Sequence, residues 1–469
     1  NAITHLDASQ SGFVELLNYI VDALFDTAVW INTSNQRAQV TKMANRLQRR
    51  FRARLNQPAP HGKSKSYILS RKRIEDPFAS LEETNEATKT WLEKQALLSR
   101  LRLLELIASY KKPKEFYQAA FAQLNSVPFR AGPFYFYVSN DKSGFTTIKR
   151  ALAIRSDSSL QGHISKRAKT VFAAKKLADS SSWLSDYRIN SAGDLLAYGL
   201  SKNGSDFETW RVRDLKSGKD LPDIIEDVPS GSISFHPRKR GLFYRRSTTS
   251  AAHGAEPTYT KGAAIYFHRL GEQEKNDKII HNPGKVEWVD LYALKQSQHV
   301  LISEWPGGKL HNRLAIKSLT SGKICHLFPR KLGYYSLLGE VKGKIYIKTD
   351  HQAARGRVLA LEFDYGHLRV KSIREIVKES QFAIQDVRLL QDRLISSNLD
   401  QEGRARLLQF DLSGKQLSEI ELPFEGTLSS LSTSFNDSTI FFSLENFATP
   451  KTIYRHNLKS GETSVLHQP

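Results

Sequence analysis

The sequence predicts a mainly β fold, a seven-bladed β-propeller, preceded by an α-helical N-terminal segment. From about residue 127 onward, short β-rich runs such as Phe134–Val138 and Ile440–Ser443 are separated by turn residues. Glycine-containing turns also recur at intervals of 53, 51, 44, 48 and 47 residues, at Gly218, Gly271, Gly322, Gly366, Gly414 and Gly461. Spacings of about 40–50 residues match one four-stranded blade, and seven such units fill the stretch from about residue 131 to the end. A β-sandwich with glycine turns is the alternative, but it needs no spacing this regular.

The N-terminal part of the chain is basic and helical in pattern. Between Gln36 and Arg73 there are twelve Lys or Arg residues and no acid. Within this stretch, apolar residues recur at spacings of three and four behind a candidate N-cap, Ser34, as expected for an amphipathic helix. We therefore divide the chain into a basic helical hairpin and linker (1–70), a helical lead-in segment (71–126) and the propeller (127–469).

The formal net charge of +21 favours acidic partners, and more than half of the excess lies in residues 36–73. Two interpretations of this segment stay open. It binds an anionic partner, or its basic face is solvated and covers the acids of the neighbouring helix. Aromatic residues are not interleaved with the basic ones, which disfavours nucleic-acid binding.

Composition narrows the class of protein further. A single cysteine, Cys325, excludes a disulfide framework and any cysteine-based zinc site. The most apolar stretch, 13–31, contains Glu15, Asp22 and Asp26, which argues against a transmembrane segment. We expect a cytoplasmic protein, although the start at Asn1 leaves a periplasmic or secreted one open.

Several stretches carry a recognisable pattern. They are Glu75–Phe78 with Leu81-Glu82, Val127–Tyr137, Gly193–Ser201 leading to Asp206, Arg355–Arg357, Ile420–Pro423 and Phe447–Pro450. Together they resemble the N-terminal and propeller parts of the prolyl oligopeptidase family of serine peptidases, over roughly residues 71 to 469. One departure is Ala79-Ser80, which stands where the family usually has an aromatic residue.

The resemblance implies an α/β-hydrolase domain after the propeller, with its serine on a G-x-S-x-G turn. Gly62-Lys-Ser64 and Gly199-Leu-Ser201 each lack a glycine two residues after the serine. We therefore expect no catalytic residue in this chain, and a hydrolase domain beyond Pro469 or on another chain. The family uses neither a metal nor a cofactor, so none is expected.

The resemblance also suggests individual site residues. Asp206 matches an acid that faces an arginine of the hydrolase domain. The three substrate-pocket positions are Ser230, Val289 and Lys317. Val289 remains apolar, but Ser230 replaces an aromatic residue and Lys317 a small apolar one, so a preference for proline is in question.

Two functions follow from these observations. In the first, the propeller is a filter that admits short peptides to a serine peptidase, which cleaves them through an acyl-enzyme. The alternative is a stand-alone binding propeller, a degenerate relative that holds a partner on its ring face or basic hairpin. Ser230 and Lys317 favour the alternative, and Asp206 disfavours it.

Overall fold

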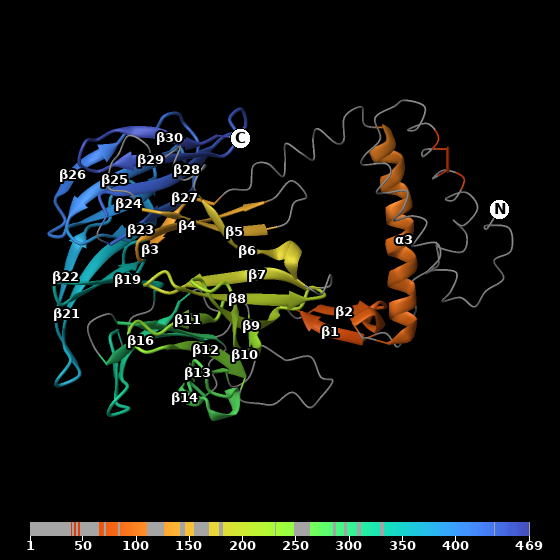
Figure 1. Cartoon of the computed structure of the whole chain (residues 1–469), viewed down its shortest axis with the longest axis horizontal. Helices are drawn as coiled ribbons and strands as arrows, with labels where there is room; N and C mark the ends of the chain where they lie inside the picture. The colour runs from red at the N-terminus through yellow and green to blue at the C-terminus, as the bar shows by residue number, and fades with distance from the viewer. Residues whose placement is uncertain are drawn as a thin grey trace. The chain divides into compact units, whose positions relative to one another are not determined.

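A computed structural model gives the fold (Figure 1). It describes residues 65–69, 72–82, 85–109, 126–140, 146–153, 168–177, 182–229, 231–247, 263–284, 288–294, 298–306, 311–328, 333–435 and 437–468, with Gln39, Lys42, Met43 and Arg46. The chain divides into two compact units, Asn1–Phe121 and Ala122–Pro469. Most of the predicted basic helix and its linker lies outside the described residues.

The N-terminal unit contains a β-hairpin followed by one long helix. Its elements are β1 (Lys65–Leu69), β2 (Lys72–Asp76), the 3-10 turn η2 (Ala79–Glu82) and α3 (Glu86–Ser109). Asn85 begins the helix, because its side-chain oxygen accepts the backbone N–H of Thr88 at 3.0 Å. The helix confirms the expectation of a helical N-terminal segment, whereas the hairpin was not indicated by the sequence patterns.

The C-terminal unit is a propeller of seven four-stranded antiparallel sheets, in agreement with the predicted fold. Blade 1 contains β3 (Phe129–Ala131), β4 (Phe134–Asn140), β5 (Thr146–Leu152) and β6 (Lys169–Ala173), followed by η4 (Ala174–Lys176). Blade 2 contains β7 (Ser182–Ile189), β8 (Leu195–Lys202), β9 (Phe207–Asp214) and β10 (Asp220–Pro229). Blade 3 contains β11 (Ile233–Phe235), β12 (Gly241–Ser247), β13 (Ala263–Arg269), η5 (Glu274–Asn276) and β14 (Lys278–His281). Blade 4 contains β15 (Trp288–Ala293), β16 (His299–Trp305), β17 (Arg313–Ser318) and β18 (Ile324–His326).

The remaining three blades repeat the same order and bring the chain back to the first blade. Blade 5 contains β19 (Tyr335–Val341), β20 (Lys344–Thr349), β21 (Arg357–Asp364) and β22 (Arg369–Val377). Blade 6 contains β23 (Ala383–Leu389), β24 (Arg393–Leu399), β25 (Ala405–Asp411) and β26 (Gln416–Ile420). Blade 7 contains β27 (Thr427–Thr433), β28 (Thr439–Glu445), β29 (Thr452–Asn457) and β30 (Thr463–His467). Strand β27 contacts β3, so blade 7 lies beside blade 1 and the ring is closed (Figure 1).

Burial explains why the strands differ in composition. The second strand of a blade, such as β8 or β28, is buried along almost its whole length, because neighbouring blades cover both faces. The fourth strand, such as β26, is mostly exposed and correspondingly polar. An apolar core cluster lies at every junction between consecutive blades, including the junction of blades 7 and 1.

The turns between the third and fourth strands account for the glycine repeat. Gly218 has φ +73° and Gly414 φ +95°, conformations that favour glycine. At Gly414 a Cβ atom would also collide with the carbonyl of Ile376 in blade 5. Blade 5 differs, because the left-handed residue in its turn is Leu368 and not Gly366.

A buried histidine joins blades 2 and 3. The His268 ring on β13 lies 2.9 Å from Asp223 Oδ1 on β10 and 2.8 Å from Asp277 Oδ1 before β14. A neutral imidazole has one N–H, so only the protonated ring donates to both carboxylates. Burial lowers the pKa of His268, but the hydrogen bonds and charges of Asp277 and Asp223 outweigh it and raise the pKa overall.

Ring closure also involves a polar contact. Asp437, in the connection between β27 and β28, accepts the Tyr135 hydroxyl at 2.9 Å and an Arg130 N–H at 3.3 Å. Both partners belong to blade 1. These bonds reinforce the apolar cluster between the last and first blades, which no shared strand connects.

The His268 contact predicts a specific pH dependence. Because its folded pKa lies above the unfolded value near 6.5, its stabilisation is complete below that pH and is lost as the pH rises through the folded pKa. Urea unfolding between about pH 6 and about pH 9 should show stability falling for the wild type, and a flatter curve for His268→Gln. Exposed His367→Gln should retain the wild-type slope. An unchanged slope in His268→Gln would contradict the protonated contact.

The ring closure predicts that Asp437→Ala destabilises the propeller. The variant loses two hydrogen bonds from a side chain that is only 13% exposed, and we expect a cost of about 2 kcal/mol in the free energy of unfolding. As a control, Asp392→Ala removes a 63% exposed acid that pairs with its neighbour Arg393, and should change stability by less than about 0.5 kcal/mol. Equal thermal unfolding of both variants would mean that the apolar cluster alone closes the ring.

Candidate functional site

The inner strands of the blades surround the axis of the propeller. The first strand of each blade is innermost, and neighbouring inner strands touch, as β7 does with β11 and β23 with β27. Two hollows are lined by these strands. One, of about 250 Å³, involves blades 2 to 4, and the other, of about 370 Å³, involves blades 4 to 7. The axial channel therefore has room for ligand atoms at two places.

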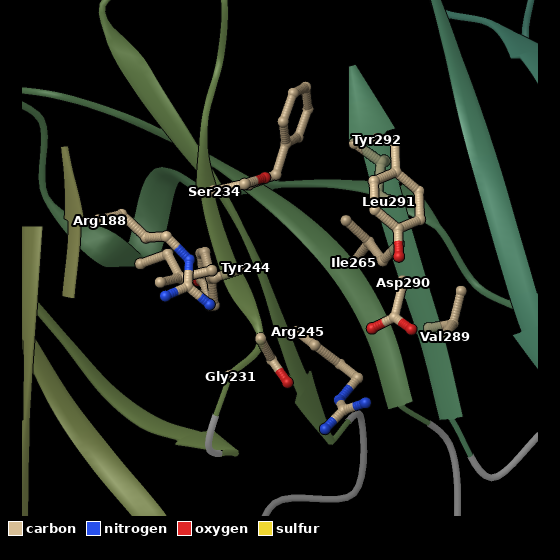
Figure 2. A pocket seen from close by; sticks show the side chains of 13 residues that line it. Arg188, Gly231, Ser234, Tyr244, Arg245, Ile265, Val289, Asp290, Leu291 and Tyr292 are labelled. Carbon is tan, nitrogen blue, oxygen red and sulfur yellow. The ribbon is translucent and has the colours of Figure 1, made fainter. Parts of the chain in front are cut away.

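The smaller hollow, here called the blade 2–4 pocket, is lined by charged side chains from three blades. Arg188 comes from β7, Arg245 from β12, and Asp290 and Tyr292 from β15. Figure 2 shows the two guanidinium groups and the Asp290 carboxylate around the same space. The rest of the described lining is mainly apolar, with two serines and the backbone of Gly231.

Arg188 is positioned by a local motif. Its guanidinium bonds to Asp186 and to the carbonyl of Tyr187, and Asp186 also accepts the N–H of Tyr187 at 2.7 Å. A β-bulge between Leu184 and Asp186 turns this part of β7. Ion pairing with Asp186 fixes the direction in which the Arg188 side chain points.

Blade 6 repeats the motif at the same place in its inner strand. Arg388 pairs with Asp386 at 2.7 Å, and Asp386 accepts the N–H of Val387 after a bulge. Asp386 and Arg388 line the larger hollow. The Asp-x-Arg pattern in two blades is thus a signal in the sequence that could have pointed to channel-lining residues.

Asp290 is held on the opposite wall of the blade 2–4 pocket. Its carboxylate accepts the indole N–H of Trp288 at 2.8 Å and that of Trp305 at 3.3 Å. Burial raises the pKa of Asp290, while the Trp288 bond, the charge of Arg245 and the Trp305 bond act in the opposite direction. The guanidinium of Arg245 lies over the Trp288 ring.

Tyr292 adds a hydroxyl donor to the pocket. Burial, with the charges of Asp290 and Tyr334, raises its pKa to about 12, so the hydroxyl keeps its proton near neutral pH. The described lining thus combines guanidinium, hydroxyl and carboxylate groups with apolar surface, and it includes no histidine. This chemistry suits the binding of a polar chain.

The residues suggested by the sequence are dispersed. Val289 lines the blade 2–4 pocket but is 1% exposed and belongs to the core between blades 3 and 4. Lys317 on β17 does not line it. Its Nζ donates to the carbonyl of Ile280 at 2.7 Å, and burial lowers its pKa. Asp206 is exposed between β8 and β9, and Ser230 lies outside the described residues.

Two further findings concern metal sites and membrane-spanning helices among the described residues. No group of three or more His, Cys, Asp or Glu residues among them is arranged to hold a metal ion. None of their helices is both long and apolar enough to cross a membrane.

Comparison with known proteins shows that one family model matches most of the chain. The family model of the prolyl oligopeptidase N-terminal β-propeller domain matches residues 58–469. The chain is 24% identical over 432 residues to prolyl oligopeptidase A of Amanita bisporigera, covering 83% of this chain and 54% of the relative. It is 22% identical over 405 residues to a prolyl endopeptidase of Elizabethkingia miricola, covering 85% and 55%.

Solved structures agree on the fold. Prolyl oligopeptidase B of Galerina marginata, bound to a 25mer macrocyclization substrate, superimposes with a TM-score of 0.75 at 18% identity, covering 88% of this chain and 61% of that one. The chain thus spans just over half the length of the curated relatives it matches.

The structure predicts a structural effect for Lys317. Lys317→Ala loses the bond that ties β17 of blade 4 to β14 of blade 3, and should cost about 1 kcal/mol in the free energy of unfolding. Exposed Lys323→Ala, in the turn after β17, is the control and should leave urea unfolding unchanged. If Lys317→Ala left stability unchanged but weakened peptide binding, its role would lie in a substrate pocket instead.

Proposed function

Because the chain belongs to the prolyl oligopeptidase family and matches its propeller domain, we propose that it is the substrate-gating portion of a serine peptidase that hydrolyses short peptides. The observation that carries this proposal is the charged pocket on the wall of a closed seven-bladed ring. An extended peptide offers N–H, C=O and side-chain groups to Arg188, Tyr292 and Asp290. A folded protein presents too wide a surface to reach side chains on the inner strands.

Catalysis in this proposal belongs to an α/β-hydrolase domain, in cis beyond Pro469 or in trans. Exposed Asp206 is the residue we assign to contact with that domain, by analogy with the family. Val289 remains our candidate for an apolar contact with substrate, and Ser230 and Lys317 for positions that alter the preference for proline. By the same resemblance, cleavage proceeds through a serine acyl-enzyme without metal or cofactor.

A second candidate function is a stand-alone binding propeller. Ser230 and Lys317 favour it, because by the resemblance they replace an aromatic and a small apolar residue of a proline-binding pocket. We also propose that residues 36–73 bind an anionic partner and that the protein is cytoplasmic. These proposals rest on the twelve basic residues and the single cysteine.

Filling the blade 2–4 pocket tests the gating function. Ser234 lines it, so Ser234→Trp should weaken binding of a short fluorescein-labelled peptide by at least about tenfold in fluorescence anisotropy. Ser372→Trp, on the exposed outer strand β22, should bind as the wild type does. Arg188→Ala provides a second variant in which no bulk is added. If Ser234→Trp and Arg188→Ala both retain full affinity, the pocket is not part of the peptide path.

A competition experiment tests whether the channel admits short peptides and excludes folded proteins. The unlabelled peptide should displace the probe, whereas the same sequence held as a loop of a folded carrier protein should not. Adding the hydrolase domain of a family member separates the two candidate functions. Peptidase activity that is lost in Asp206→Ala supports gating, and its absence with an active hydrolase domain supports the binding propeller.

A further inference from the structure

The connections that follow the inner strands lie together at one end of the axial channel. The N–H of Gly132, after β3, donates to the carbonyl of Ser191, after β7, at 2.9 Å. Likewise Gln391, after β23, donates to Phe435, after β27, at 3.0 Å. Asp437 then links the connection of blade 7 to blade 1. These contacts make the connections a rim around one channel mouth.

In blade 3 this connection, here called the mouth hairpin (236–240), carries three consecutive exposed cations, Arg238, Lys239 and Arg240. Hydrogen bonds hold the backbone of this hairpin in place. His236 Nδ1 accepts the N–H groups of Arg238 at 3.0 Å and Lys239 at 2.9 Å, and the carbonyl of Arg240 accepts the N–H of Leu270. Burial, together with the charges of Lys239 and Arg238, lowers the pKa of His236 to about 4. The ring therefore stays neutral and keeps its acceptor nitrogen near neutral pH.

The charge of the mouth hairpin extends toward another side of the ring. Arg238 is close enough to Glu340, on the inner strand of blade 5, to oppose the rise that burial causes in the pKa of that carboxyl. Glu340 is only 8% exposed, and its Oε2 atom has no hydrogen-bond partner among the described residues. The positive charge thus acts between blades 3 and 5, two blades apart, at the rim.

Acids on the same rim are already engaged locally. Asp392 pairs with Arg393 at 2.8 Å, Asp437 with Arg130 at 3.3 Å, and Asp194 bonds to Asn190. In contrast, no carboxylate of the described residues forms an ion pair with Lys239 or Arg240. The Lys239 ammonium lies 5.9 Å from the centre of the Phe267 ring. The charge of Arg240 contributes to lowering the pKa of Asp214, but neither Lys239 nor Arg240 is held in an ion pair by a described carboxylate, so both remain exposed cations beside the channel.

We propose that the mouth hairpin is a docking element for acidic peptides, so that the substrates entering this channel are rich in Asp and Glu. This inference rests on the proposed function and specifies its substrate class. Exposed cations at a narrow opening raise the local concentration of an anionic chain and orient it before it enters. Such attraction is salt-dependent, because the charges are exposed to solvent.

The test compares two short fluorescein-labelled peptides, one containing several glutamates and the other glutamine at the same positions. At about 50 mM NaCl the wild-type chain should bind the glutamate peptide about tenfold more tightly in fluorescence anisotropy, and the difference should shrink at about 300 mM. The triple variant Arg238→Gln, Lys239→Gln, Arg240→Gln should bind both peptides about equally.

A charge-matched control separates the mouth hairpin from net charge. Lys371→Gln, Arg374→Gln, Lys378→Gln removes three exposed cations from the outer side of blade 5, and should keep the preference for the glutamate peptide. Equal loss in both triple variants, or no preference in the wild type, overturns the inference and leaves gating intact. Failure of the wild type to bind either peptide overturns the gating proposal as well.

Discussion

The fold depends on the apolar contact between consecutive blades. A single four-stranded sheet has two faces and buries neither by itself, so each blade is stable only between two others. Seven core clusters occupy the seven junctions, and the last of them joins Phe441 and Ile453 of blade 7 to Tyr135 and Ala151 of blade 1. Because the strands of each sheet are consecutive in sequence, closure relies on this packing and on Asp437, and not on a strand exchanged between first and last blades.

Two buried histidines at these junctions have carboxylate partners. His268 lies between two carboxylates at the blade 2–3 junction, and His281 bonds to Glu304 at 3.0 Å between blades 3 and 4. An unpaired charge buried at a junction would lower the free energy of unfolding, whereas a paired charge fixes how adjacent blades align. At the inner strands, Asp290 is partly buried and faces a pocket. The same chemistry that orders the junctions therefore supplies polar groups to the channel wall.

These features connect the family to a function. The chain matches a propeller domain and spans just over half the length of the relatives it matches, so the contribution we propose for it in a peptidase is the selection of substrate. Selection would occur in two places. The rim carries the long-range charge of the mouth hairpin, and the wall of the blade 2–4 pocket provides short-range contacts through Arg188, Arg245 and Asp290. A pocket for a proline side chain alone would be apolar, whereas this pocket is lined by charged groups.

The architecture could be predicted from local features of the amino-acid sequence. Strand length, turn chemistry and the glycine period are local properties, and the period of about one blade was sufficient to predict seven blades. A helical N-terminal segment was also predicted, and α3 confirms it. The catalytic serine motif is likewise a local pattern, so its absence from these residues could be read directly. In contrast, the β1–β2 hairpin did not stand out among helix-forming neighbours.

The composition of the site, in contrast, depends on long-range contacts. Arg188, Arg245 and Asp290 come from three blades and meet only because the ring brings their strands around one axis, so no sequence window contains them. The amine of Lys317, a residue that the resemblance assigns to a substrate pocket, bonds to a carbonyl of the preceding blade, a partner 37 residues away that no sequence pattern indicated. His268 gave no signal in the sequence, since its two carboxylates lie 45 residues before it and 9 after it. Local patterns specify the repeating unit, whereas ring closure determines which side chains face each other across it.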